Sequence, residues 1–593
     1  MAPVIHPRIA VVADAHFHDL HGDYGLPDQG GATGRFAIRR LAETARSLRV
    51  FNESHTALLH TLDDIAARGI RHVVLLGDYS DDGQIASLAG LRRILERYSK
   101  RAGLHFYAVP GNHDIFGTDG RHRTKRFMNA TGGYDVATSD PTFRDAGAGQ
   151  VGVSSAMYCP GYPQGLSALP DVGFFGTPSA LHWETPFGRE AGVDSRLYPV
   201  DMGNDVPAGR LMDASYLIEP FDGVWLMMID ANVFRPFSQA ERPLHREDYA
   251  DSASAGWNAM LTHKPFMLNW MKDVALRAQV QGKRLLTFSH YPVLDPLDGT
   301  GLDEQTLLGL SGFAKRIPEP TVGRAMIECG ITTLFSGHLH INDTARYREG
   351  DRFVINVSVP SLVAFPGAYK IIGIRDTTLE IETVEIADMP LNPKVVASYR
   401  EEILQTGLNA QRLADCSGYG DFLNEHIGHL VARRHLKRDW PQDLANLFHT
   451  TTLADLAAIA LTKVPNLPDD LSMLRTGAMA AAIADAEVGA GLDHGRLAEV
   501  PSLSFLQDWY RLRMGSDIAI EYLPQGDLRA YRLVADLFAR LTAVGDSVQA
   551  RLALVFMIFT KYLTGLPSHG FSIDLQTGDL RPRPTTDGLS VGP

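Results

Sequence analysis

Cysteine is scarce in this chain. Its 593 residues include three cysteines, Cys159, Cys329 and Cys416, which lie far apart and form no CxxC pair. We therefore expect neither a disulfide framework nor a thiolate zinc site. Long apolar runs are also missing, so we expect no membrane-spanning helix. The first residues lack the basic and apolar regions of a signal peptide, and we expect a cytoplasmic protein.

Basic residues are in deficit as well. The chain has 56 Lys and Arg against 69 Asp and Glu, which gives a formal net charge of -13. Proteins that bind nucleic acid through non-specific phosphate contacts usually present basic surfaces. The negative net charge therefore disfavours nucleic acid as a partner, whereas a small substrate is compatible with it. The hydrophobic content of 45% is typical of globular proteins, and the length predicts two or more domains.

Several short apolar segments end in residues that carry chemistry. They are rich in β-branched or aromatic residues and are flanked by turn residues, which is typical of buried strands. These segments are residues 8–16, 71–81, 105–114, 284–292 and 331–340. Helical patterns lie between them at residues 52–69, 85–103 and 322–330. The alternation predicts an α/β sheet covered by helices.

Acidic, amide and imidazole side chains gather at the ends of these segments. They are Asp14, His16, Asp78, Asp81, Asn112, His113, Asp114, His290, His338 and His340. Ligands bind at the carboxyl ends of strands in such sheets, so we expect these side chains to converge. On an extended backbone, Asp14 and His16 would point to the same side. Oxygen and nitrogen ligands without thiolate suit divalent Mn, Fe, Zn, Co or Ni, and seven groups fit two ions that share one carboxylate.

The order of the motifs points to a known family. D-x-H, G-D-x-x-D, G-N-H-D, a histidine after a strand and G-H-x-H follow one another. In this order they resemble the calcineurin-like metallophosphoesterase family, over residues 9–345 for the motifs and to about 389 for the sheet. The resemblance implies a layered β-sandwich flanked by helices. It also implies two metal ions, drawn from Mn, Fe, Zn or Co, with Mn or Fe favoured.

The resemblance also implies roles for individual residues. Asp14, His16 and His340 would bind the first metal; Asn112, His290 and His338 would bind the second; and Asp78 would bridge both. His113 would be the catalytic histidine beside the metals. Asp114 would orient His113, and Asp81 would anchor its motif without touching a metal. Six further polar or aromatic residues near the strand ends or in the inserts could contact substrate, although a structural role is favoured: His18, Asn52, Glu53, Tyr79, Asn232 and Phe234.

The expected reaction is hydrolysis of a phosphoric ester by a water molecule held between the two ions. The G-N-H-D form resembles the branch that includes cyclic-nucleotide phosphodiesterases, so we expect a small phosphodiester, with a cyclic nucleotide as the first candidate. A phosphomonoesterase or nucleotidase is the alternative. A non-catalytic interaction protein is disfavoured, because such a protein should have lost ligands and none is missing.

The composition changes near residue 390. We predict a catalytic domain over residues 1–389, interrupted by a long insert at about 117–263. Leucine and alanine at helical spacing predict a separate all-α domain over residues 394–567, and residues 568–593 read as a polar tail. We expect the helical domain to cap the cleft or to mediate self-association, and in the second case the chain would form a homo-oligomer.

Overall fold

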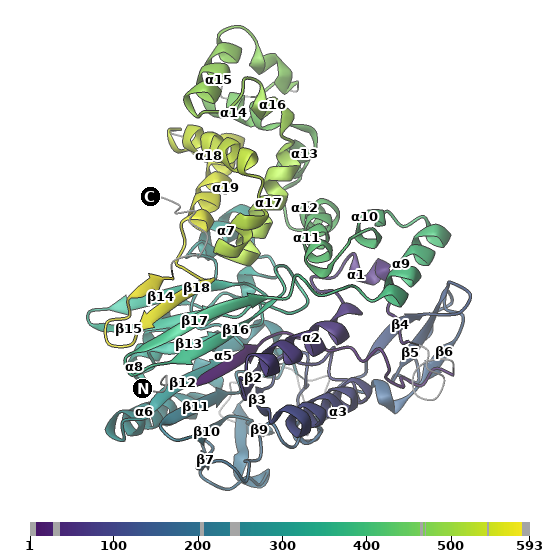
Figure 1. Ribbon diagram of the computed structural model, residues 1–593, viewed down its shortest axis with the longest axis vertical. Helices are drawn as coiled ribbons and strands as arrows, with labels where there is room; N and C mark the ends of the chain where they lie inside the picture. Colours follow the sequence, from purple (N-terminus) through teal and green to yellow (C-terminus); the bar gives the residue numbers. More distant parts are fainter. Residues whose placement is uncertain are drawn as a thin grey trace.

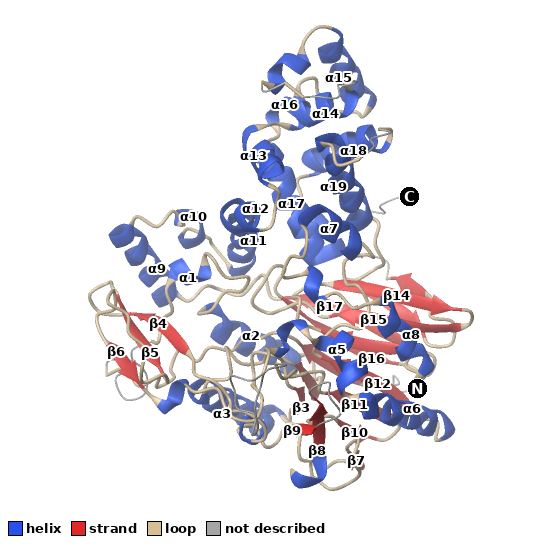
Figure 2. Cartoon of the chain, turned by 180° about the vertical axis from the view of Figure 1, so that it is seen from behind, coloured by secondary structure: helices blue, strands red, loops and turns tan. Residues whose placement is uncertain are grey.

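Two seven-stranded sheets form the centre of the molecule (Figures 1 and 2). The computed structural model describes residues 7–27, 36–201, 207–237, 249–462, 467–468, 470–541 and 545–583. The first sheet has the order β19 (Leu580–Pro582), β18 (Gly570–Asp574), β17 (Thr378–Glu385), β16 (Ala368–Ile374), β1 (Arg8–Val12), β2 (His72–Leu76), β3 (His105–Val109). The second has the order β14 (Asp343–Glu349), β15 (Arg352–Ser358), β13 (Thr333–Ser336), β12 (Arg284–Ser289), β11 (Val224–Ile229), β10 (Tyr216–Phe221), β7 (His182–Glu184).

The inner strands of both sheets are parallel. β1, β2 and β3 run parallel to one another, as do β11, β12, β13 and β15. Helices α2 (Glu53–Ala67) and α3 (Ile85–Ala102) make the crossovers of the first sheet. Parallel strands that are joined by crossovers present their carboxyl ends at one edge, where a site can form. The three predicted helices are confirmed to within two residues, the third as α8 (Pro320–Glu328).

Side chains along β11 show how the layers pack. Leu226 and Met228 belong to the core shared with the first sheet, whereas Trp225 and Met227 face a second core. This alternation follows from the two-residue repeat of a strand. The second core is closed by α5 (Gly256–His263), α6 (Pro265–Val280) and α8. The predicted α/β sandwich with flanking helices is confirmed.

The predicted insert is partly core. β7, β10 and β11 lie within residues 117–263, yet they belong to the second sheet. The remainder forms a three-stranded sheet of β4 (Thr124–Met128), β5 (Tyr134–Thr138) and β6 (Val151–Val153), the hairpin β8 (Leu197–Asp201) and β9 (Pro207–Met212), and the short helix α4 (Gln164–Ser167). Two more short helices lie outside it, α1 (Leu41–Thr44) and α7 (Gly301–Leu308).

The region after residue 392 is helical and packs on the sandwich (Figure 1). Its helices are α9 (Pro393–Thr406), α10 (Gln411–Ala414), α11 (Tyr419–Leu430), α12 (Leu436–Arg438), α13 (Gln442–Thr450), α14 (Leu453–Leu461), α15 (Ala478–Gly489), α16 (Arg496–Glu499), α17 (Ser502–Gly515), α18 (Gln525–Ala539) and α19 (Val548–Leu563). One π-helical turn, Val431–His435, joins α11 to α12. A bidentate ion pair between Arg513 and Glu304 (2.6 and 2.8 Å) fastens this region to the catalytic part.

The predicted polar tail is in part a structural element. Residues 570–574 and 580–582 form β18 and β19, which extend the first sheet: β18 pairs antiparallel with β17, and β19 pairs antiparallel with β18. Phe571 and Ile573 are fully buried there, which explains the pairing, because alternate apolar residues cover the sheet. Residues 584–593 lie outside the described part.

Among the residues that the structure describes, no helix is long and apolar enough to cross a membrane, and all three cysteines are free thiols.

Candidate metal centre

All seven predicted ligands lie directly after strands that run toward one edge of the sandwich. Asp14 and His16 follow β1, Asp78 follows β2, and Asn112 follows β3. From the second sheet, His290 follows β12, while His338 and His340 follow β13. The structure therefore brings together side chains that are more than 300 positions apart in the sequence, as expected from the strand ends.

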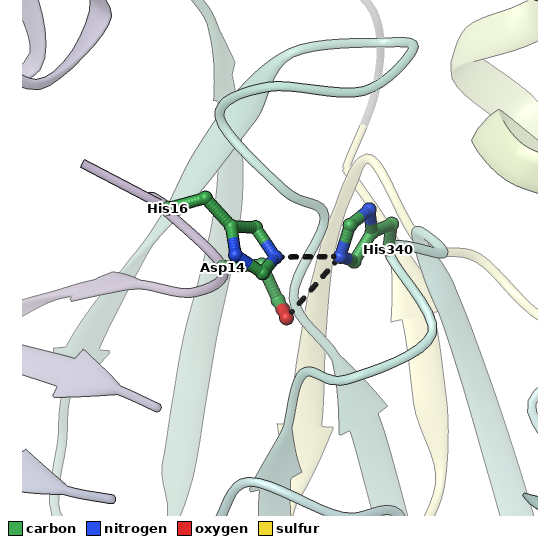
Figure 3. A group of neighbouring side chains, drawn as sticks. All are labelled: Asp14, His16 and His340. Atoms are coloured by element: carbon green, nitrogen blue, oxygen red, sulfur yellow. Dashed lines mark hydrogen bonds and ion pairs between the residues drawn. The ribbon is translucent and has the colours of Figure 1, made fainter. Parts of the chain in front are cut away.

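One group of possible ligands consists of Asp14, His16 and His340 (Figure 3). The two Nε2 atoms of the histidines lie 3.1 Å apart, and His340 Nε2 lies 3.5 Å from Oδ1 of Asp14. Asp14 and His16 are almost fully buried. Two imidazoles and a carboxylate at this spacing fit one divalent ion.

A second group consists of Asp78, His290 and His338. His290 donates from Nδ1 to the carbonyl of Leu76 (2.9 Å), and His338 donates from Nε2 to the carbonyl of Ala253 (3.0 Å). These bonds fix the tautomers and leave the lone pairs on His290 Nε2 and His338 Nδ1, both buried without a hydrogen-bond partner. A metal ion would satisfy both atoms.

Asp78 lies between the two groups. Its Oδ2 is 3.3 Å from Nε2 of His290 and 3.8 Å from Nε2 of His16, while its Oδ1 accepts a hydrogen bond from the backbone N–H of His113 (2.7 Å). One oxygen therefore faces both groups, as a bridging carboxylate would. Asn112 lines the same cavity, and its Oδ1 is buried without a partner. The side chains that are present fit two ions.

The backbone at these positions is not extended. Asp14, His16, Asp78, His338 and His340 all have positive φ angles, between 40° and 72°. The expectation that Asp14 and His16 share a side because they follow strand alternation is thus wrong in its reason, since β1 ends at Val12. Left-handed backbone is unfavourable for residues with a Cβ, and such strain concentrates at functional sites.

Two motif glycines allow the ligands to approach the backbone. A Cβ on Gly337 would lie 2.5 Å from Oδ2 of Asp14, and one on Gly111 would lie 2.1 Å from Oδ1 of Asp78. Neither space can hold a methyl group. Gly337 also lets the next backbone N–H, that of His338, donate to Asp14 Oδ2 (2.9 Å). The glycines of G-H-x-H and G-N-H-D are therefore required by close approach.

Protonation states at the site suit metal binding. Burial and the nearby Arg49 charge lower the pKa of His16, and burial and Arg316 lower that of His338. Burial opposes the ionisation of Asp78, but His290 and His113 outweigh it and hold its pKa well below the usual value. Burial likewise disfavours protonated His290, yet the Asp78 carboxylate raises its pKa to about 9. A metal ion would replace that proton.

His113 lies beside both groups but is oriented differently from the expectation. Its Nδ1 contacts the carboxylate of Asp82, and its Nε2 lies 3.2 Å from Nη1 of Arg49 and 4.0 Å from Oδ2 of Asp78. Asp114 does not contact the imidazole: its carboxylate accepts hydrogen bonds from Ser80 and from the backbone N–H of Gly111. The predicted role of Asp114 is therefore wrong, because the Nδ1 atom of His113 contacts Asp82 instead.

Asp81 anchors its loop. Its carboxylate forms buried ion pairs with Arg39 and Arg49, both at 3.0 Å, and lies 3.4 Å from Lys125. These contacts hold Arg49 against His113.

The six further residues considered near the strand ends, His18, Asn52, Glu53, Tyr79, Asn232 and Phe234, are all buried. The side chains of His18, Asn52 and Asn232 form hydrogen bonds with backbone carbonyls of the protein.

A cavity of about 260 Å³ opens above the two groups. Its floor includes Asp78, His113 and His338, and its roof comes from the helical region, including His426, Arg434, His435 and Tyr510. Arg49 and Arg316 also line it. Sequence reasoning missed these lining residues, because an arginine in a loop or a histidine in a helix carries no motif.

A comparison with protein families matches the N-terminal part of the chain. Residues 7–154 match the family described as calcineurin-like phosphoesterase, a segment that holds Asp14, His16, Asp78, Asn112 and His113. No curated protein matches the chain. Its listed structural neighbours include a dimetal phosphatase from Danio rerio, with 13% identity, 64% of this chain and 98% of that chain covered, and a TM-score of 0.34.

Two further solved structures are similar over most of their own length. GAP50, the anchor in the inner membrane complex of Plasmodium, has 9% identity, covers 64% of this chain and 85% of its own, and has a TM-score of 0.27. A phosphopantetheinyl hydrolase (PptH) from Mycobacterium tuberculosis has 12% identity, covers 60% and 90%, and has a TM-score of 0.22. The match to the calcineurin-like phosphoesterase family thus covers residues 7–154, and the motif order continues beyond that segment to His340.

Proposed function

We propose that this protein hydrolyses a small phosphodiester with two metal ions. One observation carries the proposal: the Asp78 carboxylate faces two groups of buried ligands, and His113 lies against it in a cavity that the helical region roofs. Asp14, His16 and His340 would hold one ion, and Asn112, His290 and His338 the other, with Asp78 between them. Two such ions supply Lewis acidity, neutralising phosphoryl oxygens and promoting the ionisation of water.

His113 would handle the proton of the leaving group at Nε2. Asp82 holds Nδ1, so the ring keeps one tautomer and a positive charge on it is stabilised. Burial and the Arg49 guanidinium lower the pKa of His113 in the free protein. A phosphoryl group that pairs with Arg49 removes this repulsion, so His113 gains a proton as substrate binds and can pass it to the departing oxygen.

The roof over the cavity supports a small substrate. His426, Arg434 and Tyr510 close the space above the two groups, so a compact phosphoester fits better than a nucleic-acid strand. The cavity also lies above His113, where an ester oxygen of a diester would leave. A phosphomonoesterase is the second candidate, because Arg49 beside His113 would pair well with a dianionic phosphate.

Model substrates separate these functions. With Mn²⁺-loaded protein, we expect bis-p-nitrophenyl phosphate to be hydrolysed with a higher kcat/KM than p-nitrophenyl phosphate. The same ranking should hold for 3′,5′-cyclic nucleotides against 5′-mononucleotides. Asp78→Asn and His113→Asn should lose at least about 100-fold in kcat, whereas His122→Asn, a histidine whose ring contacts Ser139, serves as the matched control. The reverse preference favours the monoesterase; full turnover by both site variants contradicts a metal-dependent hydrolase.

We further propose Mn or Fe as the native ions and the cytoplasm as the location. The donors are imidazole, carboxylate and amide groups, a set that suits these metals. Metal analysis of protein purified without added metal tests the first proposal. Microscopy of the tagged chain in its own cell tests the second.

A further inference from the structure

We propose that Arg434 and Arg316 bind a second phosphate group of the substrate, apart from the phosphodiester that is cleaved. This inference rests on the proposed function and specifies its substrate class: a small phosphodiester that carries a second phosphate. Both arginines line the cavity above the two ligand groups, Arg316 from the catalytic part and Arg434 from the helical region.

The two guanidinium groups differ from the other arginines of the cavity in lacking a carboxylate. Arg513 pairs with Glu304, and Arg49 pairs with Asp81. Neither Arg316 nor Arg434 forms an ion pair with any residue in the described ranges, and Nε of Arg316 and Nη1 of Arg434 are buried without a hydrogen-bond partner. Both side chains are half-buried, and a buried donor nitrogen without a partner is costly, so an anion that accepts from these nitrogens is favoured.

The nearest carboxylate to Arg434 is already used. Asp439 accepts a hydrogen bond from Nδ1 of His435 (2.8 Å), which in turn stacks on Tyr510 with ring centres 4.6 Å apart. His426 donates from Nε2 to the carbonyl of Thr44 (2.9 Å). The neighbours of Arg434 are thus satisfied by one another, and its guanidinium is left for a ligand.

The backbone that carries Arg434 is unusual. Val431–His435 forms a π-helical turn between α11 and α12. Such turns are rare, and they occur frequently at functional sites because they displace side chains from the regular helical positions. Here the turn places Arg434 and His435 in the roof of the cavity, while Arg433, one position earlier, is exposed to solvent.

Arg316 lines the cavity on the side of the catalytic part, near the second ligand group. It ends a short helical turn, Ala314–Arg316, between β12 and β13, and its charge acts on His338 in the second ligand group. Arg434 reaches the same cavity from the helical region, beside His426 and His435. Leu430, Ile427 and Met514 also line the cavity, and such apolar walls strengthen the attraction between the charges and a phosphate.

A phosphodiester brings a single negative charge, and the metal ions would neutralise it. The two unpaired guanidinium groups then select substrates with a further dianionic phosphate, since arginine binds phosphate through charge-assisted hydrogen bonds. A cyclic mononucleotide, which has one charged phosphate, would leave both arginines without a partner. Phosphodiesters with a second phosphate therefore bind best.

Two chromogenic diesters test the proposal directly. Thymidine 5′-(p-nitrophenyl phosphate) and its 3′-phosphorylated derivative differ by one phosphate only. We expect the wild type to favour the 3′-phosphorylated compound in kcat/KM by about tenfold or more, the value of one or two hydrogen bonds between charged groups. Arg434→Gln and Arg316→Gln should each bring the ratio toward one, mainly through KM. Arg433→Gln, a matched change on the same turn, should keep it.

A wild-type ratio near one, or a ratio that Arg433→Gln lowers as much as Arg434→Gln, would overturn the proposal. Failure of the proposed function looks different, because then neither compound releases p-nitrophenol. In that case calorimetry with thymidine 3′,5′-bisphosphate and thymidine 5′-monophosphate still decides. The bisphosphate should bind about tenfold tighter or better to the wild type and lose this advantage in Arg434→Gln. Equal affinities in the wild type would refute the second phosphate site.

Discussion

The carboxylate of Asp82 contacts Nδ1 of His113. The same carboxylate accepts a charge-assisted hydrogen bond from Lys125, so it is itself held in place. His113 therefore has one nitrogen fixed by the protein and the other, Nε2, turned toward Asp78 and Arg49. This arrangement makes Asp82 the residue that positions the imidazole.

Asp82→Asn should accordingly reduce kcat by about tenfold or more, because the amide no longer fixes the tautomer or stabilises the imidazolium. The pH dependence of kcat should shift at the same time, which a loss of packing alone would not cause. Asp114→Asn is the control: Asp114 holds the backbone of Ser80 and Gly111, so its loss should lower stability with a smaller effect on the pH profile. Identical pH profiles for Asp82→Asn and the wild type would contradict the assignment.

His338 and His340 belong to different ligand groups, although they are two residues apart. We expect His340→Ala to lose mainly the ion held with Asp14 and His16, and His338→Ala mainly the ion held with Asp78 and His290. Each variant should retain about one ion per chain, since each site keeps its other ligands. Metal content by inductively coupled plasma mass spectrometry measures this. Loss of both ions from each variant would leave the separate assignment without support.

The ion pair between Arg513 and Glu304 joins the helical region to the catalytic part and is almost fully buried. Glu304→Gln leaves the guanidinium buried without its partner, and we expect a loss of about 3–5 kcal/mol in stability. Thermal unfolding of the full chain measures it. The double variant Glu304→Gln/Arg513→Gln should lose less than the sum of the two single changes, because the charges compensate one another. Strict additivity would show that the pair does not couple the regions.

Lys370 is fully buried in β16, where its ammonium donates to Asn342, Thr383 and the carbonyl of Ser568, each at 2.7 Å. Burial lowers its pKa from 10.5 to about 7. Above pH 7 the folded chain has lost this proton while the unfolded chain keeps it, so stability should rise with pH between about 7 and 10.5. The slope of this contribution is at most about 1.4 kcal/mol per pH unit.

Lys370→Met removes that dependence. The difference in unfolding free energy between wild type and variant, measured in urea from pH 6.5 to pH 9, should therefore change in favour of the wild type as the pH rises. A difference that stays constant over this range would show that Lys370 keeps its charge in the folded protein.

The sequence predicts that the candidate ligands converge, because each is a metal-binding residue type at the end of a recognisable strand. It cannot predict Arg49, which lies in a loop and meets His113 only in the fold, 64 positions away. Asp82 was missed because Asp81 and Asp82 are adjacent and alike, and the positive φ of Asp82 decides which of them faces His113. Strand β18 does carry a sequence signal, since its buried residues Phe571 and Ile573 alternate with Ser572 and Asp574.

In the proposed reaction, two metal ions that share the Asp78 carboxylate would support phosphodiester hydrolysis. Its most direct test measures metal content and bis-p-nitrophenyl phosphate turnover together, for the wild type and for Asp78→Asn. We expect two ions per chain in the wild type, loss of turnover on chelation with recovery on adding Mn²⁺, and loss of both metal and turnover in the variant. A chelated wild type or an Asp78→Asn variant with undiminished turnover would contradict it.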